Sequence, residues 1–162
     1  MWSPDGEQVA FDSWRGGNAD IWTLSTKTGE LTRLTSGTDS DHHPTWSPDG
    51  QWIAFVRFGK PGIWRIPAKG GDAELVSTIP GNFARYSPNG DDIYVLYPTD
   101  GAGNIWAFST KTGQEWAVTN LENRTGALGA VTLATDGRYV YFTWEEDFSD
   151  IWVMDVVNDE ND

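Results

Sequence analysis

The sequence has no cysteine, which excludes disulfide bonds, thiol catalysis and thiolate metal sites. It also has no apolar run near the roughly 18 residues that a membrane-spanning helix needs, so we expect no membrane insertion. Basic residues are scarce, 11 against 24 acidic ones, and the formal net charge is −13. Because no basic stripe is available to neutralise phosphates, nucleic acid is not an expected partner.

Aromatic residues and glycine are abundant instead, and they recur at regular intervals. The phrase Trp-Ser-Pro-Asp-Gly occupies residues 2–6 and 46–50, with a variant at 86–90 and a weaker form at 133–137. The pair Ile-Trp recurs in step at 21–22, 63–64, 105–106 and 151–152. Proline presets the second position of a β-turn and glycine accepts a positive φ, so each phrase predicts strand, turn and strand. Two markers with one period indicate a repeat protein.

Each repeat has room for four short antiparallel strands joined by turns. The expected units are residues 1–40, 41–80, 81–126 and 127–157, followed by an acidic tail at 158–162. We expect only three strands in the last unit, because the tail is too acidic and too poor in apolar residues to pair.

The second strand of a unit, such as 52–56, is apolar on both faces, although successive side chains of a strand point to opposite sides. Each sheet must therefore be covered twice, and neighbouring sheets of the same kind are the natural cover. This predicts an all-β fold, a β-propeller of four blades. We expect the recurrent tryptophans to pack between blades: Trp22, Trp46, Trp52, Trp64, Trp106 and Trp152.

The segments 44–50, 52–55 and 62–66 resemble the repeat of TolB-type β-propellers, which also occurs in the propeller domains of tricorn-like and prolyl-oligopeptidase-like peptidases. The resemblance covers nearly the whole chain and implies a propeller whose inner strand ends in Trp-Ser. It also implies a periplasmic or secreted location. TolB-type proteins resemble six-bladed rings, whereas this sequence has four repeat units. Three alternatives follow: a closed four-bladed ring, half of an eight-bladed ring completed by a homodimer, or an excerpt of a longer protein.

Loops that join second to third strands, and those that enter each inner strand, share one face of a propeller. Aromatic and arginine side chains on such a rim are typical anchors of interfaces, although loop aromatics can also simply fill the channel. Asp12 and Asp100 lie on the same expected face. The candidate binding residues are Trp14, Arg15, Asp41, His42, His43, Arg57, Phe58, Asn82, Phe83, Trp144 and Glu145.

The sequence contains no nucleophile elbow and no phosphate-binding glycine loop, so neither a catalytic motif nor a cofactor is predicted. Adjacent histidines on an extended strand point to opposite sides, which argues against a shared metal. We therefore expect a non-catalytic module that recognises a protein or peptide. The alternatives are a carbohydrate hydrolase or lyase that uses Asp41, Asp100 or Glu145 at the channel mouth, and the propeller of a larger peptidase-type protein.

Overall fold

The computed structural model describes residues 1–97, 103–121, 124–146 and 149–155. Within these ranges the chain forms four antiparallel sheets of three or four strands, and its helical content is one short 3-10 turn, η1 (Trp14–Gly16). The expected all-β meander is confirmed. Among the described residues, no helical segment has the length and apolar character needed to cross a bilayer.

Each sheet is a run of strands that are consecutive in the sequence. The first contains β1 (Gln8–Ser13), β2 (Asp20–Ser25) and β3 (Leu31–Arg33). The second contains β4 (Ser40–Trp46), β5 (Trp52–Phe58), β6 (Ile63–Pro67) and β7 (Glu74–Ser77). The third contains β8 (Phe83–Tyr86), β9 (Asp92–Tyr97), β10 (Asn104–Ser109) and β11 (Glu115–Ala117). The fourth contains β12 (Ala127–Thr135), β13 (Tyr139–Glu145) and β14 (Ser149–Asp155).

The first sheet differs from the four-stranded unit that the repeat predicts. Its expected inner strand, Met1–Ser3, lies beside β1 but forms only an isolated bridge between Trp2 and Val9. The backbone N–H of Ala10 donates to the carbonyl of Met1 at 2.8 Å, and that of Ser3 donates to Gln8 at 2.8 Å. The first sheet therefore consists of three strands and this bridge.

The repeated turns are held by the same hydrogen bonds in successive sheets. In the second sheet, the Ser47 hydroxyl donates to Asp49 Oδ1 at 2.5 Å and accepts the backbone N–H of Trp52 at 2.9 Å. Ser87 and Asn89 repeat the first contact in the third sheet at 2.7 Å. Serine and aspartate are therefore part of the turn, because they satisfy backbone and side-chain groups that no ladder reaches.

Both faces of the second sheet are buried, as the apolar pattern of its second strand predicts. Ile53 and Phe55 pack with Ala10 and Ile21 of the first sheet. Ala54 and Val56, which point the other way, belong to a cluster shared with the third sheet. Neighbouring sheets therefore supply each other's cover. In this inter-sheet packing Trp46 is buried, and Trp64 and Trp106 are partly buried; the side chain of Trp152 lies outside the described residues.

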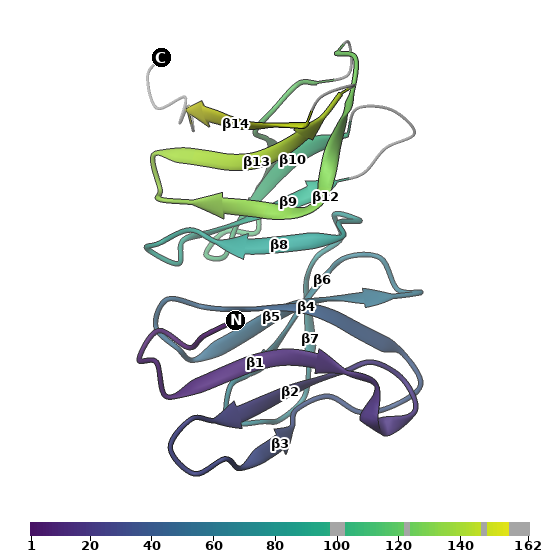
Figure 1. Cartoon of the computed structure of the whole chain (residues 1–162), viewed down its shortest axis with the longest axis vertical. Helices are drawn as coiled ribbons and strands as arrows, with labels where there is room; N and C mark the ends of the chain where they lie inside the picture. The colour runs from purple at the N-terminus through teal and green to yellow at the C-terminus, as the bar shows by residue number, and fades with distance from the viewer. Residues whose placement is uncertain (98–102, 122–123, 147–148, 156–162) are drawn as a thin grey trace.

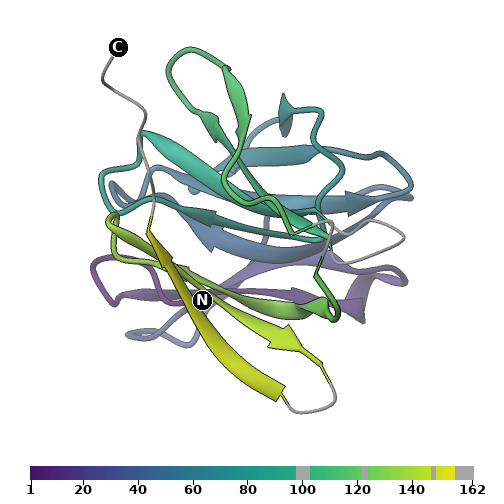
Figure 2. The same cartoon turned by 90° about the horizontal axis from the view of Figure 1, so that it is seen from above.

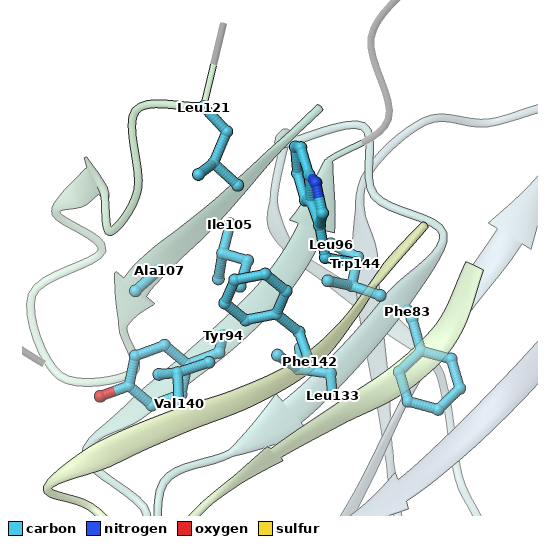
Figure 3. Close-up of a cluster of buried hydrophobic side chains, with 10 residues drawn as sticks. All are labelled: Phe83, Tyr94, Leu96, Ile105, Ala107, Leu121, Leu133, Val140, Phe142 and Trp144. Atoms are coloured by element: carbon cyan, nitrogen blue, oxygen red, sulfur yellow. The ribbon is translucent and has the colours of Figure 1, made fainter. Parts of the chain in front are cut away.

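A further cluster joins the third sheet to the fourth, where side chains of β9 and β10 meet those of β12 and β13 (Figure 3). Figure 1 shows the four sheets following one another along the longest axis, with the first and the last at opposite ends. Contacts between successive sheets run chiefly through the first strands, from β1 to β4, β4 to β8 and β8 to β12. Seen from above, the strands of successive sheets run in different directions, so each sheet is rotated relative to the one before it (Figure 2).

Candidate functional site

The ends of β1 and β5 and the starts of β4 and β8 bring the two histidines together with three aromatic side chains. The strand register explains this meeting, because His42 of β4 is the direct partner of Val56 and Ser40 is that of Phe58. We call this group the aromatic rim and define it as Trp14, His42, His43, Phe58 and Phe83.

His42 is the buried centre of the rim, with 9% of its surface exposed. Its Nδ1 lies 3.3 Å from Oδ2 of Asp12, and its ring centroid lies 4.4 Å from that of Phe58. The other ring nitrogen, Nε2, is buried and has no hydrogen-bond partner among the described residues. A buried polar atom without a partner is costly, so this nitrogen marks a place where a ligand group or water would be stabilised.

His43 shows why the expectation of opposed histidine rings was wrong. Its φ is +56°, and the register of β4 against β5 shifts between His42 and Thr45. This bulge breaks the alternation of an extended strand, and the two imidazole centroids lie 5.9 Å apart. The His43 ring contacts Phe83 at 5.3 Å, and its backbone N–H donates to Asp12 at 3.3 Å.

Burial is the main influence on the pKa of His43 and lowers it below the usual value. The carboxylate of Asp12 acts in the opposite direction, whereas His42 and Arg85 add to the lowering. The His43 imidazole is therefore biased toward its neutral form, which can both donate and accept a hydrogen bond.

Trp14 and Phe58 form the exposed part of the rim. They are 64% and 52% exposed, although large aromatic side chains are usually buried. Trp14 begins η1, directly after β1, and its ring centroid lies 6.1 Å from that of His42. Phe58 ends β5. Both residues therefore lie at the ends of regular elements, with more than half of each side chain exposed to solvent.

Asp41 and Arg57, two predicted site residues, are bound to each other. The guanidinium donates from Nε and Nη2 to the two carboxylate oxygens at 2.7 and 3.0 Å, and Asp41 is 2% exposed. Arg57 also lies over the ring of Trp64 at 4.4 Å. The pair supports the strand ends beneath the rim, and its charges are already compensated.

The other predicted residues are placed as follows. Arg15, Asn82 and Glu145 are exposed. Trp144 is 2% exposed and lies in the core between the third and fourth sheets, where its indole N–H donates to Thr125 at 3.1 Å (Figure 3). Asp100 lies outside the described residues. Within those residues, no group of three His, Cys, Asp or Glu side chains is arranged to hold a metal ion.

Arg85 is a site residue that reasoning from the sequence missed. It lies in β8, and its guanidinium carbon is 4.4 Å from the centroid of Phe83. A signal was available, because the residue before the turn phrase is Met1, Thr45 or Thr132 in the other units. A charged residue at that position of an inner strand breaks the repeat.

Antiparallel sheets that follow one another through their first strands, with both faces packed, define the β-propeller class of protein. The chain belongs to the PD40 family, described as the TolB beta propeller domain, whose pattern matches residues 1–161.

Known proteins agree with this assignment. An uncharacterized protein of Agrobacterium fabrum, Atu1656, is 36% identical over 104 residues, which make up 61% of this chain and 36% of that protein. The Tol-Pal system protein TolB of Francisella tularensis subsp. mediasiatica is 38% identical over 55 residues, 34% of this chain and 13% of that protein. The crystal structure of TolB from Acinetobacter baumannii superposes with a TM-score of 0.80 at 21% identity, over 96% of this chain and 40% of that one. The chain therefore spans well under half the length of each of these proteins.

Proposed function

We propose that the protein is a non-catalytic binding module that recognises a protein or peptide segment through the aromatic rim. The observation that carries this proposal is the pair of exposed rings, Trp14 and Phe58, that both lie next to the buried His42. Aromatic side chains have few rotatable bonds and so lose little entropy when they are covered, and such residues dominate binding energies at interfaces. One of the similar proteins is named for the Tol-Pal system, which fits a role in recognition.

The alternative of a carboxylate hydrolase or lyase draws little support from the described residues. Asp41 is held by Arg57, and Glu145 is exposed at the end of β13. Glycoside chemistry needs two carboxyl groups that face one substrate, with the pKa of one of them raised. We therefore favour binding without catalysis, and a periplasmic or secreted location in keeping with the family resemblance.

We further propose that two copies associate to complete a ring of eight sheets. The separation of the first and last sheets in Figure 1 supports this, since in the described part of the chain each of them packs on one neighbouring sheet and the two do not meet. Trp2, at the edge of the first sheet, is 63% exposed. A solution mass twice the 18.0 kDa of one chain is the expected result. A mass near that of one chain would rule out the ring of two copies.

The binding proposal is tested by panning a library of random dodecapeptides against the immobilised protein. We expect the wild type to enrich peptides, and the double variant Trp14→Ala, Phe58→Ala to bind them at least about tenfold more weakly, because both anchors are lost. The matched control is Leu31→Ala, Leu75→Ala, which removes two side chains of 40% and 44% exposure outside the rim. Equal loss in both variants, or no enrichment by the wild type, would contradict the proposal.

A further inference from the structure

Arg85 is a partly buried guanidinium without a carboxylate partner among the described residues. Its polar contact is a hydrogen bond from Nη1 to the carbonyl of Ala84 at 3.3 Å, and its carbon Cζ lies over the ring of Phe83. Burial lowers the pKa of Arg85, and in the described ranges no carboxylate offsets that effect. Removing a charge from water without a partner is unfavourable, so this side chain needs an explanation.

Three other arginines of the sheets show what is missing. Arg33 contacts Asp20 at 2.6 Å, Arg57 contacts Asp41 at 2.7 Å and Arg65 contacts Glu74 at 2.6 Å. Acidic residues outnumber basic ones 24 to 11, so carboxylates are the more plentiful partners in this protein. Arg85 nevertheless has no such partner among the described residues, so its charge is not compensated by a carboxylate there.

The side chains next to Arg85 are those of the aromatic rim. The ring of Phe83 contacts both the Arg85 guanidinium, at 4.4 Å, and the His43 imidazole, at 5.3 Å. The buried Nε2 of His42 has no partner among the described residues, and when Nδ1 donates its proton to Asp12 this nitrogen is an acceptor, suited to a peptide N–H and not to the carboxylate itself. Arg85 thus places a fixed cation beside the rim, against the Phe83 ring that also contacts His43.

We propose that Arg85 and His43 form a subsite for a carboxylate, and that the peptide recognised by the rim carries an aspartate or glutamate there. This inference rests on the proposed function and specifies the chemistry of its partner. The guanidinium fork fits a carboxylate with two parallel hydrogen bonds, as the pair of Arg57 and Asp41 shows elsewhere in the protein. Trp14 and Phe58 then receive apolar side chains next to the acidic residue, which favours a peptide over a uronate sugar.

The test uses the peptides enriched from the random dodecapeptide library. We expect them to share an acidic residue flanked by apolar ones. The strongest peptide is synthesised in its acidic form and with Gln or Asn in place of that residue, and both dissociation constants are measured by calorimetry. The amide form should bind roughly tenfold more weakly or worse, because a hydrogen bond to a charged group is lost. Arg85→Gln should abolish this difference, and Arg65→Gln, on an arginine already paired with Glu74, should leave it intact.

The outcomes separate this inference from the proposed function. Enriched peptides without a shared acid, or equal affinities of the acidic and amide forms for the wild type, would overturn the carboxylate subsite while the rim remained a binding surface. Failure to enrich any peptide would overturn both proposals. Displacement of the peptide by trigalacturonate at a lower concentration than by free acidic peptide would overturn the peptide assignment in favour of a uronate. The comparison of acidic and amide peptides on the wild type stands even if Arg85→Gln does not fold. Arg85→Lys then tests the two-toothed guanidinium contact, because lysine keeps the charge but not the planar pair of donors, and it should retain part of the affinity difference.

Discussion

Arg57 and Asp41 are direct cross-strand partners in β5 and β4, and they close the end of the second sheet with two hydrogen bonds of 2.7 and 3.0 Å. Opposite charges at this register satisfy each other where neither is well hydrated. The Asp41 carboxylate raises the pKa of Arg57, so the arginine remains charged. From the sequence, both residues are predicted to contribute to binding. In the structure they bind each other, beside His42 and Phe58 in the same two strands.

Replacing Arg57 should therefore destabilise the fold strongly. Arg57→Met leaves the 2% exposed Asp41 carboxylate without its partner, and we expect a loss of about 3–5 kcal/mol in the free energy of unfolding. Urea denaturation followed by tryptophan fluorescence measures this loss. Lys27→Met, which breaks the exposed pair with Glu7, is the control and should have no measurable effect. Similar results for both variants would show that the buried pair is not structural.

Through the aspartates of its turns, the stability of the fold should depend on pH. The Ser47 hydroxyl, and then the backbone N–H of Gln51, lower the pKa of Asp49 below its ordinary value of 3.8. A lowered folded-state pKa means that the carboxylate stabilises the fold above pH 3.8, and that this contribution is lost as the pH falls through the folded-state pKa. Asp49→Asn should thus be less stable than the wild type at neutral pH, and the difference should shrink as the solution is acidified.

The third sheet offers the reciprocal variant, because Asn89 already occupies the same turn position. Asn89→Asp should gain stability at neutral pH relative to acid, in the opposite sense to Asp49→Asn. Thermal unfolding across this pH range measures both. A constant difference between Asp49→Asn and wild type at every pH would contradict the assignment.

Two charged residues near His43 should shift its pKa in opposite directions. NMR titration should place the pKa of His43 below its usual 6.5, because its ring is partly buried. Arg85→Gln removes a positive charge and should raise this pKa, whereas Asp12→Asn removes a negative charge and should lower it further. The folded state then binds protons less readily than the unfolded chain, so the contribution of His43 to stability falls as the pH drops below 6.5. Shifts in the same direction for both variants would refute this geometry.

Substitutions at two glycines distinguish the cost of a left-handed backbone from the cost of a steric clash with an added Cβ. Gly50 has φ +70°, and a Cβ there would meet its nearest neighbour, Pro4, at 3.8 Å. Gly50→Ala should therefore cost about 1 kcal/mol, the price of a left-handed conformation alone. Gly62 has φ +123°, and a Cβ would lie 2.5 Å from the carbonyl oxygen of Ser77. Gly62→Ala should cost at least about 2 kcal/mol by chemical denaturation, because backbone must also move. Equal costs would show that the close approach is relieved without strain.

Much of the fold follows from local features of the sequence. The phrase around Pro48 and Gly50 specifies a turn through its own φ preferences and its serine and aspartate, and its recurrence predicts repeated sheets. The apolar run 52–56 requires cover on both faces, which Ile53 and Ala54 obtain from different neighbours. These predictions succeed because turn geometry and side-chain alternation act over a few residues.

The chemistry of the rim was decided by the tertiary structure. Nothing local indicates that Asp41 is bound to Arg57 whereas Arg85 has no carboxylate partner within the described part of the chain, because ion pairing depends on strand register and on which sheet lies opposite. The positive φ of His43 brings the histidine rings together, against the alternation that an extended strand implies. The sequence by itself thus determined the repeated sheets and their turns. The packing of distant strands determined which charges are satisfied and which remain available, because compensation of charge depends on distances across the fold.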